Sequence, residues 1–398
     1  MAVEETRLDD VLVGDRERWK DGPPHELFKR LRGECPVHWS PRITEYPDEE
    51  GFWSVTTADD IHEISHDWQT YSSERGGVTA LTNAIMPLEL IQSMFIGMDP
   101  PKHDRLKMLF QRGFTPKRIA EHEDAIRAIT VGVLDRVDGQ DECDLVTDVA
   151  QPVVSRVIGS FMGIPPEDDE IWARLMNATL GAGDPDLNPQ GTEYVMQKEV
   201  PEIFERCGRL IAERRERPTD DLTSVLVHGE IEGERLEEHE IVMGFFLLVA
   251  AGNDSTKATY SSGMRALLEN PDQRELLLDD PSLIPSAVEE SLRMFPAFAH
   301  FRRTATSDVE LGDQTIHEAR RWSCGTCRRT ATRRATTTPT ASTSPATPST
   351  RRSGPAAATF AWARRWRGWS CGSCSRRPWR ASRGWSSRGA PSRSSHRS

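Results

Sequence analysis

The last 82 residues of this 398-residue chain contain no Leu, Ile, Val or Met, and this absence constrains the fold more than any other feature. The stretch 317–398 also holds 18 Arg, no Lys and a single acidic residue, Glu318, which gives it a formal charge of +17. Because the whole chain has a formal charge of −12, residues 1–316 carry a charge of −29. A segment without aliphatic side chains cannot build an ordinary hydrophobic core. We predict one folded domain over 1–316 and a disordered tail over 317–398.

Helical periodicity dominates residues 1–316, and the fold class that it predicts is mainly α with a small β region. Helices are expected over 24–31, from 100 onward, and over 118–138, 144–162, 168–180, 193–214, 220–228, 236–268 and 284–294. We expect a strand at 51–55 that leads into a helix after Thr57, an apolar loop over 75–98 and further strands only near 301–316.

Nothing in the sequence predicts secretion or a membrane anchor. The longest apolar run, 241–251, is far shorter than the roughly 20 residues of a membrane span, and no N-terminal stretch resembles a signal peptide. The scattered Cys35, Cys143 and Cys207 show no disulfide framework, which favours a reducing cytoplasm. The acidic body argues against nucleic acid as its main partner, and suits either a basic protein partner or a merely solvated surface.

Polar residues interrupt the long apolar helix predicted over 236–268. Gly252 through Thr256 is a run of five residues that favour other conformations, so we expect a loosened helix with a polar notch. In one interpretation Asp254 and Ser255 pass protons to something bound beside the helix. The alternative is a helix boundary at which either residue caps a second helix.

Three other sets of charged residues can be interpreted either as ordinary surface residues or as functional ones. Glu290 and Arg293 lie three residues apart on one helical face and can form an ion pair, which alone is most simply an ordinary surface pair. His103 and Lys107 share a face of the helix that follows Pro100-Pro101, and can grip an anion. Arg302 and Arg303 can form another such grip, although each set alone is most simply a solvated basic surface.

Taken together, these motifs resemble the cytochrome P450 family, and most closely its soluble bacterial members. The resemblance rests on an acid–alcohol pair in a long helix, a Glu-x-x-Arg motif some 35 residues later, an Arg on a following strand, and a Pro-Pro-x-His helix upstream. Their order and approximate spacing match over residues 1–316. The resemblance implies a haem b cofactor, bound at its iron by a cysteine thiolate.

The resemblance also implies roles for individual residues. Asp254 and Ser255 would deliver protons beside bound oxygen, and the helix there would bind the cofactor through Ala251 and Gly252. The haem propionates would be bound by His103, Lys107 and Arg303. Glu290 and Arg293 would be structural. Two positions depart from the usual pattern, because Ser255 stands where Thr is commoner and Lys107 where Arg is.

The cysteine loop of the family is missing from its expected place. The family's Phe-Gly-x-Gly-x-x-His-x-Cys-x-Gly loop lies about 60–70 residues beyond Glu-x-x-Arg, where this chain has 359–363, Thr-Phe-Ala-Trp-Ala. When the codons are shifted by one base, the residues from Arg352 onward permit Phe-Gly-Ala-Gly-Gly-Arg-His-Phe-Cys-Leu-Gly. The same shift turns the residues from His317 into His-Glu-Gly-Glu-Lys-Val-Val-Met-Trp-Tyr. We infer a single-base frameshift near Glu318, which leaves no metal ligand among the residues as written.

A rival interpretation gives the tail a function of its own. Cys-x-x-Cys pairs at 324–327 and 371–374 resemble zinc knuckles, and the 18 Arg would suit nucleic acid. The pairs are separated by far more than the roughly 15–20 residues usual for such sites. Both pairs also arise automatically when Met-Trp-Tyr-Val and Leu-Arg-Val-Leu codons are misread. We therefore keep the zinc- or nucleic-acid-binding protein as the alternative only.

The predicted function is that of a haem-thiolate monooxygenase acting on a hydrophobic small molecule of steroid, terpenoid or fatty type. The resemblance implies O2 as oxidant and electrons from NAD(P)H through ferredoxin reductase and ferredoxin. The loop 85–96, the helices across 168–212 and the face 245–252 would line the substrate pocket. Because the thiolate is missing, we expect the chain as written to bind haem weakly or not at all and to be inactive.

Overall fold

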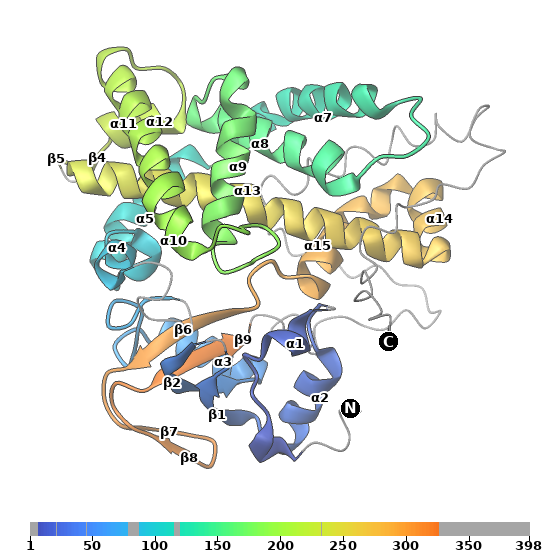
Figure 1. Ribbon diagram of the computed structural model, residues 1–398. Coiled ribbons are helices and arrows are strands. Elements are labelled where there is room, and N and C mark those ends of the chain that lie inside the picture. The colour runs from blue at the N-terminus through green and yellow to red at the C-terminus, as the bar shows by residue number, and fades with distance from the viewer. Residues whose placement is uncertain are drawn as a thin grey trace, which may run out of the picture.

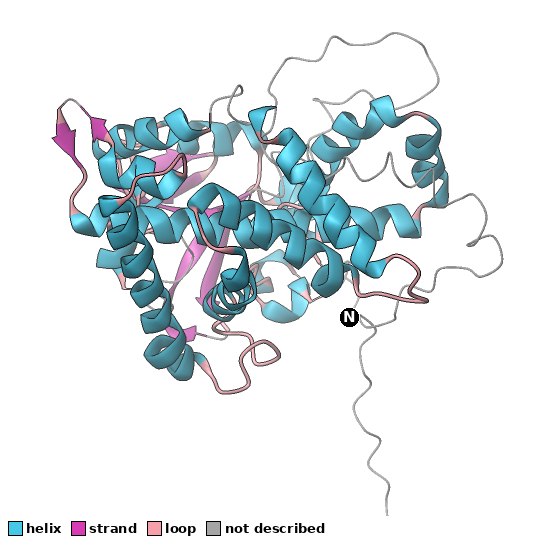
Figure 2. Ribbon diagram, turned by 90° about the horizontal axis from the view of Figure 1, so that it is seen from above, coloured by secondary structure: helices cyan, strands magenta, loops and turns pink. Residues whose placement is uncertain are grey.

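The computed structural model describes residues 7–325 apart from 21, 45, 79–86, 115–119 and 232. A long helix, α13 (Glu238–Glu269), crosses the molecule, with α7, α8, α9, α11 and α12 above it in Figure 1 and the main sheet below it. Seen from above, helices lie in front of most of the strands (Figure 2). The prediction of a mainly α fold with a small β region is confirmed.

The helices account for most of the described chain. In order they are α1 (Arg16–Trp19), α2 (His25–Glu34), α3 (Ala58–His66), α4 (Leu88–Gln92), α5 (Lys102–Gly113), α7 (Glu123–Val137), α8 (Gln151–Met162), α9 (Asp169–Leu180), α10 (Thr192–Tyr194), α11 (Val200–Glu216), α12 (Leu222–His228), α13, α14 (Pro271–Asp279) and α15 (Ile284–Met294). Most of the helices predicted from periodicity are present. The helices α1 and α14 were missed, and α4 lies in the segment predicted to be a loop.

The main sheet joins strands from both ends of the described chain. Its order is β1 (Val37–Ile43), β2 (Tyr46–Val55), β9 (Arg321–Gly325), β6 (His300–Ala305) and β3 (Tyr71–Ser72). Only the β2–β9 pair is parallel. Two small hairpins add β4 (Glu230–Ile231) with β5 (Glu234–Arg235), and β7 (Val309–Leu311) with β8 (Gln314–Ile316). The expectation of strands only at 51–55 and near 301–316 was therefore wrong for β1, β3, β4, β5 and β9.

The boundary of the folded part also differs from the prediction. Residues 317–320 form a turn and β9 continues to Gly325, so the ordered chain extends past 316 into the segment predicted to be disordered. This strand forms because its backbone pairs with β2 on one side and β6 on the other. The rest of the tail, including Cys327, Cys371 and Cys374, lies outside the described residues.

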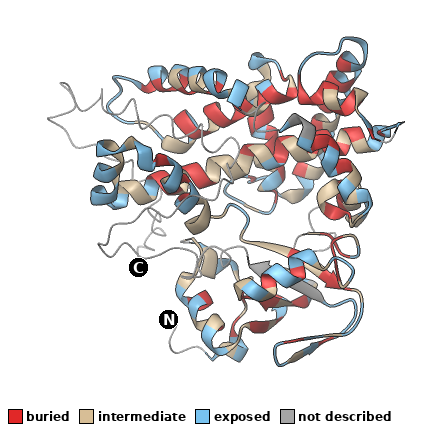
Figure 3. Ribbon diagram, turned by 180° about the vertical axis from the view of Figure 1, so that it is seen from behind, coloured by how far each residue is buried: buried red, intermediate tan, exposed pale blue. Residues whose placement is uncertain are grey.

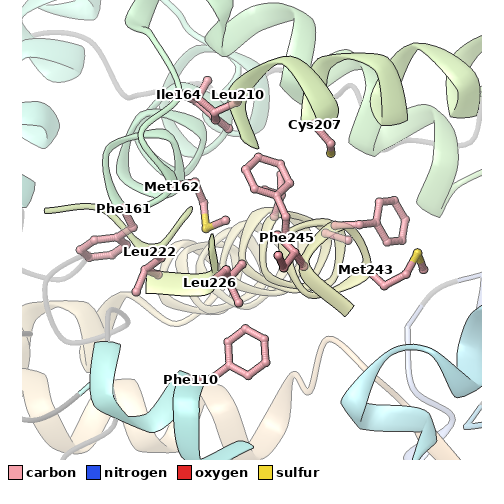
Figure 4. Close-up of a cluster of buried hydrophobic side chains, with 14 of the residues drawn as sticks. Phe110, Phe161, Met162, Ile164, Cys207, Leu210, Leu222, Leu226, Met243 and Phe245 are labelled. Atoms are coloured by element: carbon pink, nitrogen blue, oxygen red, sulfur yellow. The ribbon is translucent and has the colours of Figure 1, made fainter. Parts of the chain in front are cut away.

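The main hydrophobic core surrounds the first half of α13. The helix begins with a capping box, in which Glu237 and Glu240 satisfy each other's backbone N–H groups. Figure 4 shows Met243 and Phe245 projecting from α13 toward side chains of α5, α8, α11 and α12. Buried residues are concentrated along α13 and the helices packed on it, whereas the outer faces are exposed (Figure 3). This packing fixes the position of α13, which carries several residues of the candidate site.

None of the helices that the structure describes is both long enough and apolar enough to cross a membrane.

Candidate active site

The polar notch lies within an uninterrupted helix. Residues 251–258 are all α-helical, so neither the predicted loosening nor the alternative helix boundary is observed. The Ser255 hydroxyl is accommodated because it donates a hydrogen bond to the Ala251 carbonyl at 2.6 Å, which leaves the helical backbone intact. Packing of the long apolar flanks outweighs the weak helical preference of these few residues.

One face of the notch is left open by the described residues. Ala250 and Thr259 are buried, but Ala251 between them is exposed and Ser255 is partly exposed. Because 251 and 255 are four residues apart, they share one side of α13. A small residue and a hydroxyl therefore lie together on a face of α13 that no described residue covers completely.

Asp254 faces a different neighbourhood from Ser255. Its Oδ1 forms an ion pair with the Nζ of Lys257 at 2.9 Å. Lys257 also donates hydrogen bonds to Asn177 and Gln151, on α9 and α8. Lys257 was not predicted from the sequence, although its i,i+3 spacing from Asp254 was a usable signal. No sequence signal pointed to the two amides, because they are distant along the chain.

Gly252 packs against α8. A Cβ added there would lie 2.4 Å from Cδ1 of Ile158. The next residue, Asn253, is buried and accepts a hydrogen bond from Gln151 at 3.1 Å. The structure therefore gives Gly252 a packing role between helices α13 and α8, whereas Ala251 lies on the open face.

The three cations proposed to bind propionates come from two elements. His103 and Lys107 lie on α5 in the helical layer, and Arg303 lies on β6 in the sheet below it (Figure 1). His103 Nδ1 lies 2.9 Å from the carboxylate of Asp104. The exposed Lys107 makes no ion pair with any residue that the structure describes. Arg303 donates a hydrogen bond to the Arg302 carbonyl at 2.7 Å.

Arg302 occupies a different environment from its neighbour. It is 4% exposed, and its guanidinium lies against Gly76, where an added Cβ would come within 2.4 Å of Nη2. Successive residues of a strand point to opposite faces, so burial of Arg302 leaves Arg303 on the other side of the sheet. Of the two arginines, Arg303 is the one left to meet an anionic ligand.

Glu290 and Arg293 form the ion pair that their spacing predicts. Arg293 donates from Nε to Glu290 Oε2 at 2.7 Å, and its second nitrogen contacts the other carboxylate oxygen. These hydrogen bonds hold the pKa of Glu290 below its ordinary value. Burial and the charges of Arg32 and Arg293 lower the pKa of His25, so α15 lies near α2.

No cysteine with a described environment faces the notch. Cys207 is fully buried in the main core, and burial raises the pKa of its thiol. Cys35 lies near His38, and Cys143 packs against the cluster that contains Tyr260. The described residues also contain no group of three or more His, Cys, Asp or Glu suited to a metal ion. The open face and the basic residues would fit a flat dianionic cofactor, but a cysteine that would bind its metal is missing from the described residues around the notch.

A small cavity lies beside the notch, between α8, α9 and α13. It is lined in part by Ser155, Trp172, Met176 and Asn253, and has a volume of about 10 Å³, enough for one water molecule. The predicted substrate pocket included this region. This volume is far too small for a steroid-sized ligand. The Trp172 ring that lines the cavity also packs against Phe245, with ring centroids 5.6 Å apart.

Comparison with curated proteins finds oxygenases that act on apolar molecules. The methyl-branched lipid omega-hydroxylase of Mycobacterium tuberculosis is 35% identical over 318 residues, covering 77% of this chain and 73% of that protein. The linalool 8-monooxygenase of Pseudomonas putida is 30% identical over 305 residues, 74% of this chain and 72% of that one. The steroid C26-monooxygenase of M. tuberculosis is 31% identical over 306 residues, 77% and 72% of the two chains.

Comparison with solved structures agrees. A Mycobacterium marinum cytochrome P450 in complex with pseudoionone superposes with a TM-score of 0.74 at 32% identity, over 84% of this chain and 83% of that one. No protein-family model matches the chain. A relative more than 30% identical over nearly three quarters of its own length is nonetheless sufficient for assignment. The chain belongs to the cytochrome P450 family, whose members are monooxygenases with a haem-iron cofactor.

Proposed function

We propose that the intact form of this protein inserts one atom of O2 into a hydrophobic small molecule of steroid, terpenoid or fatty type. The observation that carries the proposal is the open face of α13, on which Ala251 and the Ser255 hydroxyl lie, with the acid Asp254 next to Ser255 in the sequence. The relatives named above act on a methyl-branched lipid, linalool and a steroid. We expect the electrons to come from NAD(P)H through a ferredoxin reductase and a ferredoxin.

The residues present would each have a defined task. His103, Lys107 and Arg303 supply the positive charge that holds the two propionates. When bound through a thiolate, haem supplies the oxygen-activating chemistry of this family. Ser255 donates a proton on the open side of α13, and Asp254 replaces it with one taken from water. The apolar residues around α13 exclude other water.

We further propose that the gene has lost one base near Glu318, and the turn before β9 supports this. Arg320 N–H donates a hydrogen bond to the His317 carbonyl at 3.2 Å, which closes a four-residue turn. Its third residue, Ala319, has a φ of +64°, the only positive φ of a non-glycine among the described residues. A turn of this kind calls for glycine at its third position. The shifted frame encodes glycine there.

Strand β9 supports the same proposal. It lies between β2 and β6, with residue 323 opposite the buried Ser54 and Arg302. Strands inside a sheet are usually runs of Val, Ile and Leu. The chain as written has Arg-Trp-Ser-Cys-Gly, whereas the shifted frame has Lys-Val-Val-Met-Trp. The relatives match about 77% of the chain, which is close to the length of residues 1–316.

The chain as written and the chain with the restored reading frame therefore differ by one base in the gene. As written, the chain keeps the oxygen-side residues and lacks the thiolate, so we expect no stable haem and no activity. With one base restored, the Cys loop and an amphipathic helix follow β9.

The test compares the chain as written with the frame-restored chain, both purified after expression with a haem precursor. We expect the reduced, carbon monoxide-bound spectrum of a thiolate-ligated haem only from the restored chain. A normal thiolate spectrum from the chain as written would overturn the frameshift proposal. If the restored chain bound no haem, the proposed function itself would fail. Stoichiometric zinc in the chain as written would favour the rival zinc-binding function.

A further inference from the structure

We propose that Lys257 is a positioning residue for Asp254, which it ties to α8 and α9 and thereby aims during proton delivery. The inference rests on the proposed function and adds a residue to it. Lys257 lies one helical turn after the acid and contacts neither Ala251 nor Ser255 in any described interaction.

The ammonium of Lys257 has an acceptor for each of its three N–H groups. Its Nζ lies 2.9 Å from Asp254 Oδ1, 2.7 Å from Asn177 Oδ1 and 3.2 Å from Gln151 Oε1. A lysine ammonium has three donors, so this set saturates it. The Lys257 side chain is 14% exposed, against 43% for Asp254. The cation is thus enclosed between helices while its acid partner still reaches solvent.

The two amide groups are themselves held in place. Asn177 donates a hydrogen bond to Gln151 Oε1 at 3.0 Å. The Nε2 of Gln151 donates to Ser155 at 2.8 Å and to Asn253 at 3.1 Å. Each amide therefore presents its oxygen to Lys257, because its nitrogen is already used. The network joins α8, α9 and α13 and leaves the ammonium little freedom to move.

The direction of Asp254 follows from this anchoring. Neighbouring residues of a helix point about 100° apart, and Lys257 holds the acid toward α8 and α9. Ser255 donates instead to Ala251 along the open face. In the proposed relay, the Asp254 carboxylate takes up a proton from solvent and passes it to the Ser255 oxygen, while the Ser255 hydroxyl passes its own proton to the ligand bound at the open face. Lys257 does not transfer a proton in this relay. It fixes the orientation of the Asp254 carboxyl group.

An exposed pair with the same spacing provides a matched control. Lys20 Nζ also lies 2.9 Å from a carboxylate three residues away, that of Glu17, but the two side chains are 59% and 78% exposed. Lys20→Met removes the same kind of charge far from α13 along the chain. We expect this variant to behave like the parent in both experiments below.

The first experiment uses the full chain as written and requires no haem. Thermal unfolding is measured for Lys257→Met, Asp254→Asn and the double variant. If the pair exists in solution, the lowering of Tm in the double variant is clearly smaller than the sum of the two single effects. Strict additivity would show that the two side chains do not interact and would overturn the inference.

The second experiment uses the haem-loaded, frame-restored chain and measures the share of NADH electrons that is released as hydrogen peroxide. We expect Lys257→Met to raise this share by about threefold, because a misaimed acid supplies protons at the wrong moment. Lys257→Arg, which keeps the cation, should return the share most of the way to the parent value. If Lys257→Met folds poorly, Asn177→Leu takes its place in this test. It keeps Lys257 but removes one hydrogen-bond acceptor, and it should also raise the share of electrons released as peroxide.

The outcomes separate this inference from the proposed function. Failure of the restored chain to give a thiolate spectrum contradicts the proposed function. A normal spectrum, with Lys257→Met and Asn177→Leu both releasing the parent share of peroxide, contradicts the role of Lys257 alone. A solvent isotope effect on product formation that changes in Lys257→Met and recovers in Lys257→Arg supports it, since a purely structural residue would not alter proton transfer.

Discussion

The backbone N–H of Ala319 donates a hydrogen bond to the carbonyl of Ala305 at 3.0 Å, and this contact sets the start of the central strand β9. Ala305 returns the contact by donating to the Arg320 carbonyl at 3.2 Å. To make this pair of bonds directly after the turn from His317, Ala319 adopts a φ of +64°. A positive φ raises the conformational free energy of a residue with a Cβ, because the Cβ approaches the following carbonyl oxygen, whereas glycine has no such penalty.

We predict that Ala319→Gly stabilises the chain as written by about 1 kcal/mol, since it removes the left-handed strain at one turn. Denaturant unfolding of the purified variant measures the change. Ala305→Gly serves as the control, because Ala305 is a buried strand residue, and it should lower stability by about 1 kcal/mol. A destabilised Ala319→Gly variant would remove the turn as support for the frameshift.

Gly252 and Gly132 should respond oppositely to alanine. An added Cβ at Gly252 would lie 2.4 Å from Cδ1 of Ile158, whereas nothing lies within 4 Å of one added at Gly132, inside α7. We expect Gly252→Ala to cost about 1 kcal/mol through displaced packing. Gly132→Ala should gain about 0.5–1 kcal/mol from helix propensity. Thermal unfolding of both variants checks this, and equal gains would show that α8 and α13 pack less closely than described.

Glu290→Gln should lower stability in a pH-dependent way. Arg293 holds the pKa of Glu290 below its ordinary value, so the carboxylate contributes stability above the unfolded pKa and loses it as pH falls through the folded pKa. Glu290 is half exposed, and we expect a difference of about 0.5 kcal/mol near pH 7 that vanishes as the pH falls below the folded pKa. Unfolding midpoints of parent and variant across this range provide the measurement. A constant difference would exclude the ion pair as its source.

Asp221→Asn should be the most destabilising of these changes. Asp221 is buried, accepts a hydrogen bond from Arg214 Nε at 2.5 Å and caps α12 through the N–H of Ser224 at 2.7 Å. Arg214 is buried too, so the variant removes its buried partner and leaves only the more exposed Glu213, 3.0 Å away, at a cost of about 3 kcal/mol. Denaturant unfolding measures the loss. Glu205→Gln, which removes an exposed partner of Arg209, is the matched control and should leave the midpoint unchanged.

Part of the candidate site could be predicted from the sequence. The Glu290–Arg293 pair follows from an i,i+3 spacing, and Asp254 and Ser255 stand out because they interrupt an apolar helix. The network on Lys257 was not accessible, because Gln151 and Asn177 lie 106 and 80 residues away along the chain. Periodicity says which side of a helix is polar, but it does not say which distant amide faces that side.

The sequence by itself determined the long helix α13, most of the other helices and the break in composition after residue 316. These are local properties, since a run of periodic apolar residues has only one way to bury its face. Only the tertiary structure decided that Arg321–Gly325 forms a central strand, that Ala319 needs a left-handed backbone and that Lys257 holds Asp254. Each of these depends on backbone or side-chain partners from distant segments, whose positions are settled only when the whole core packs.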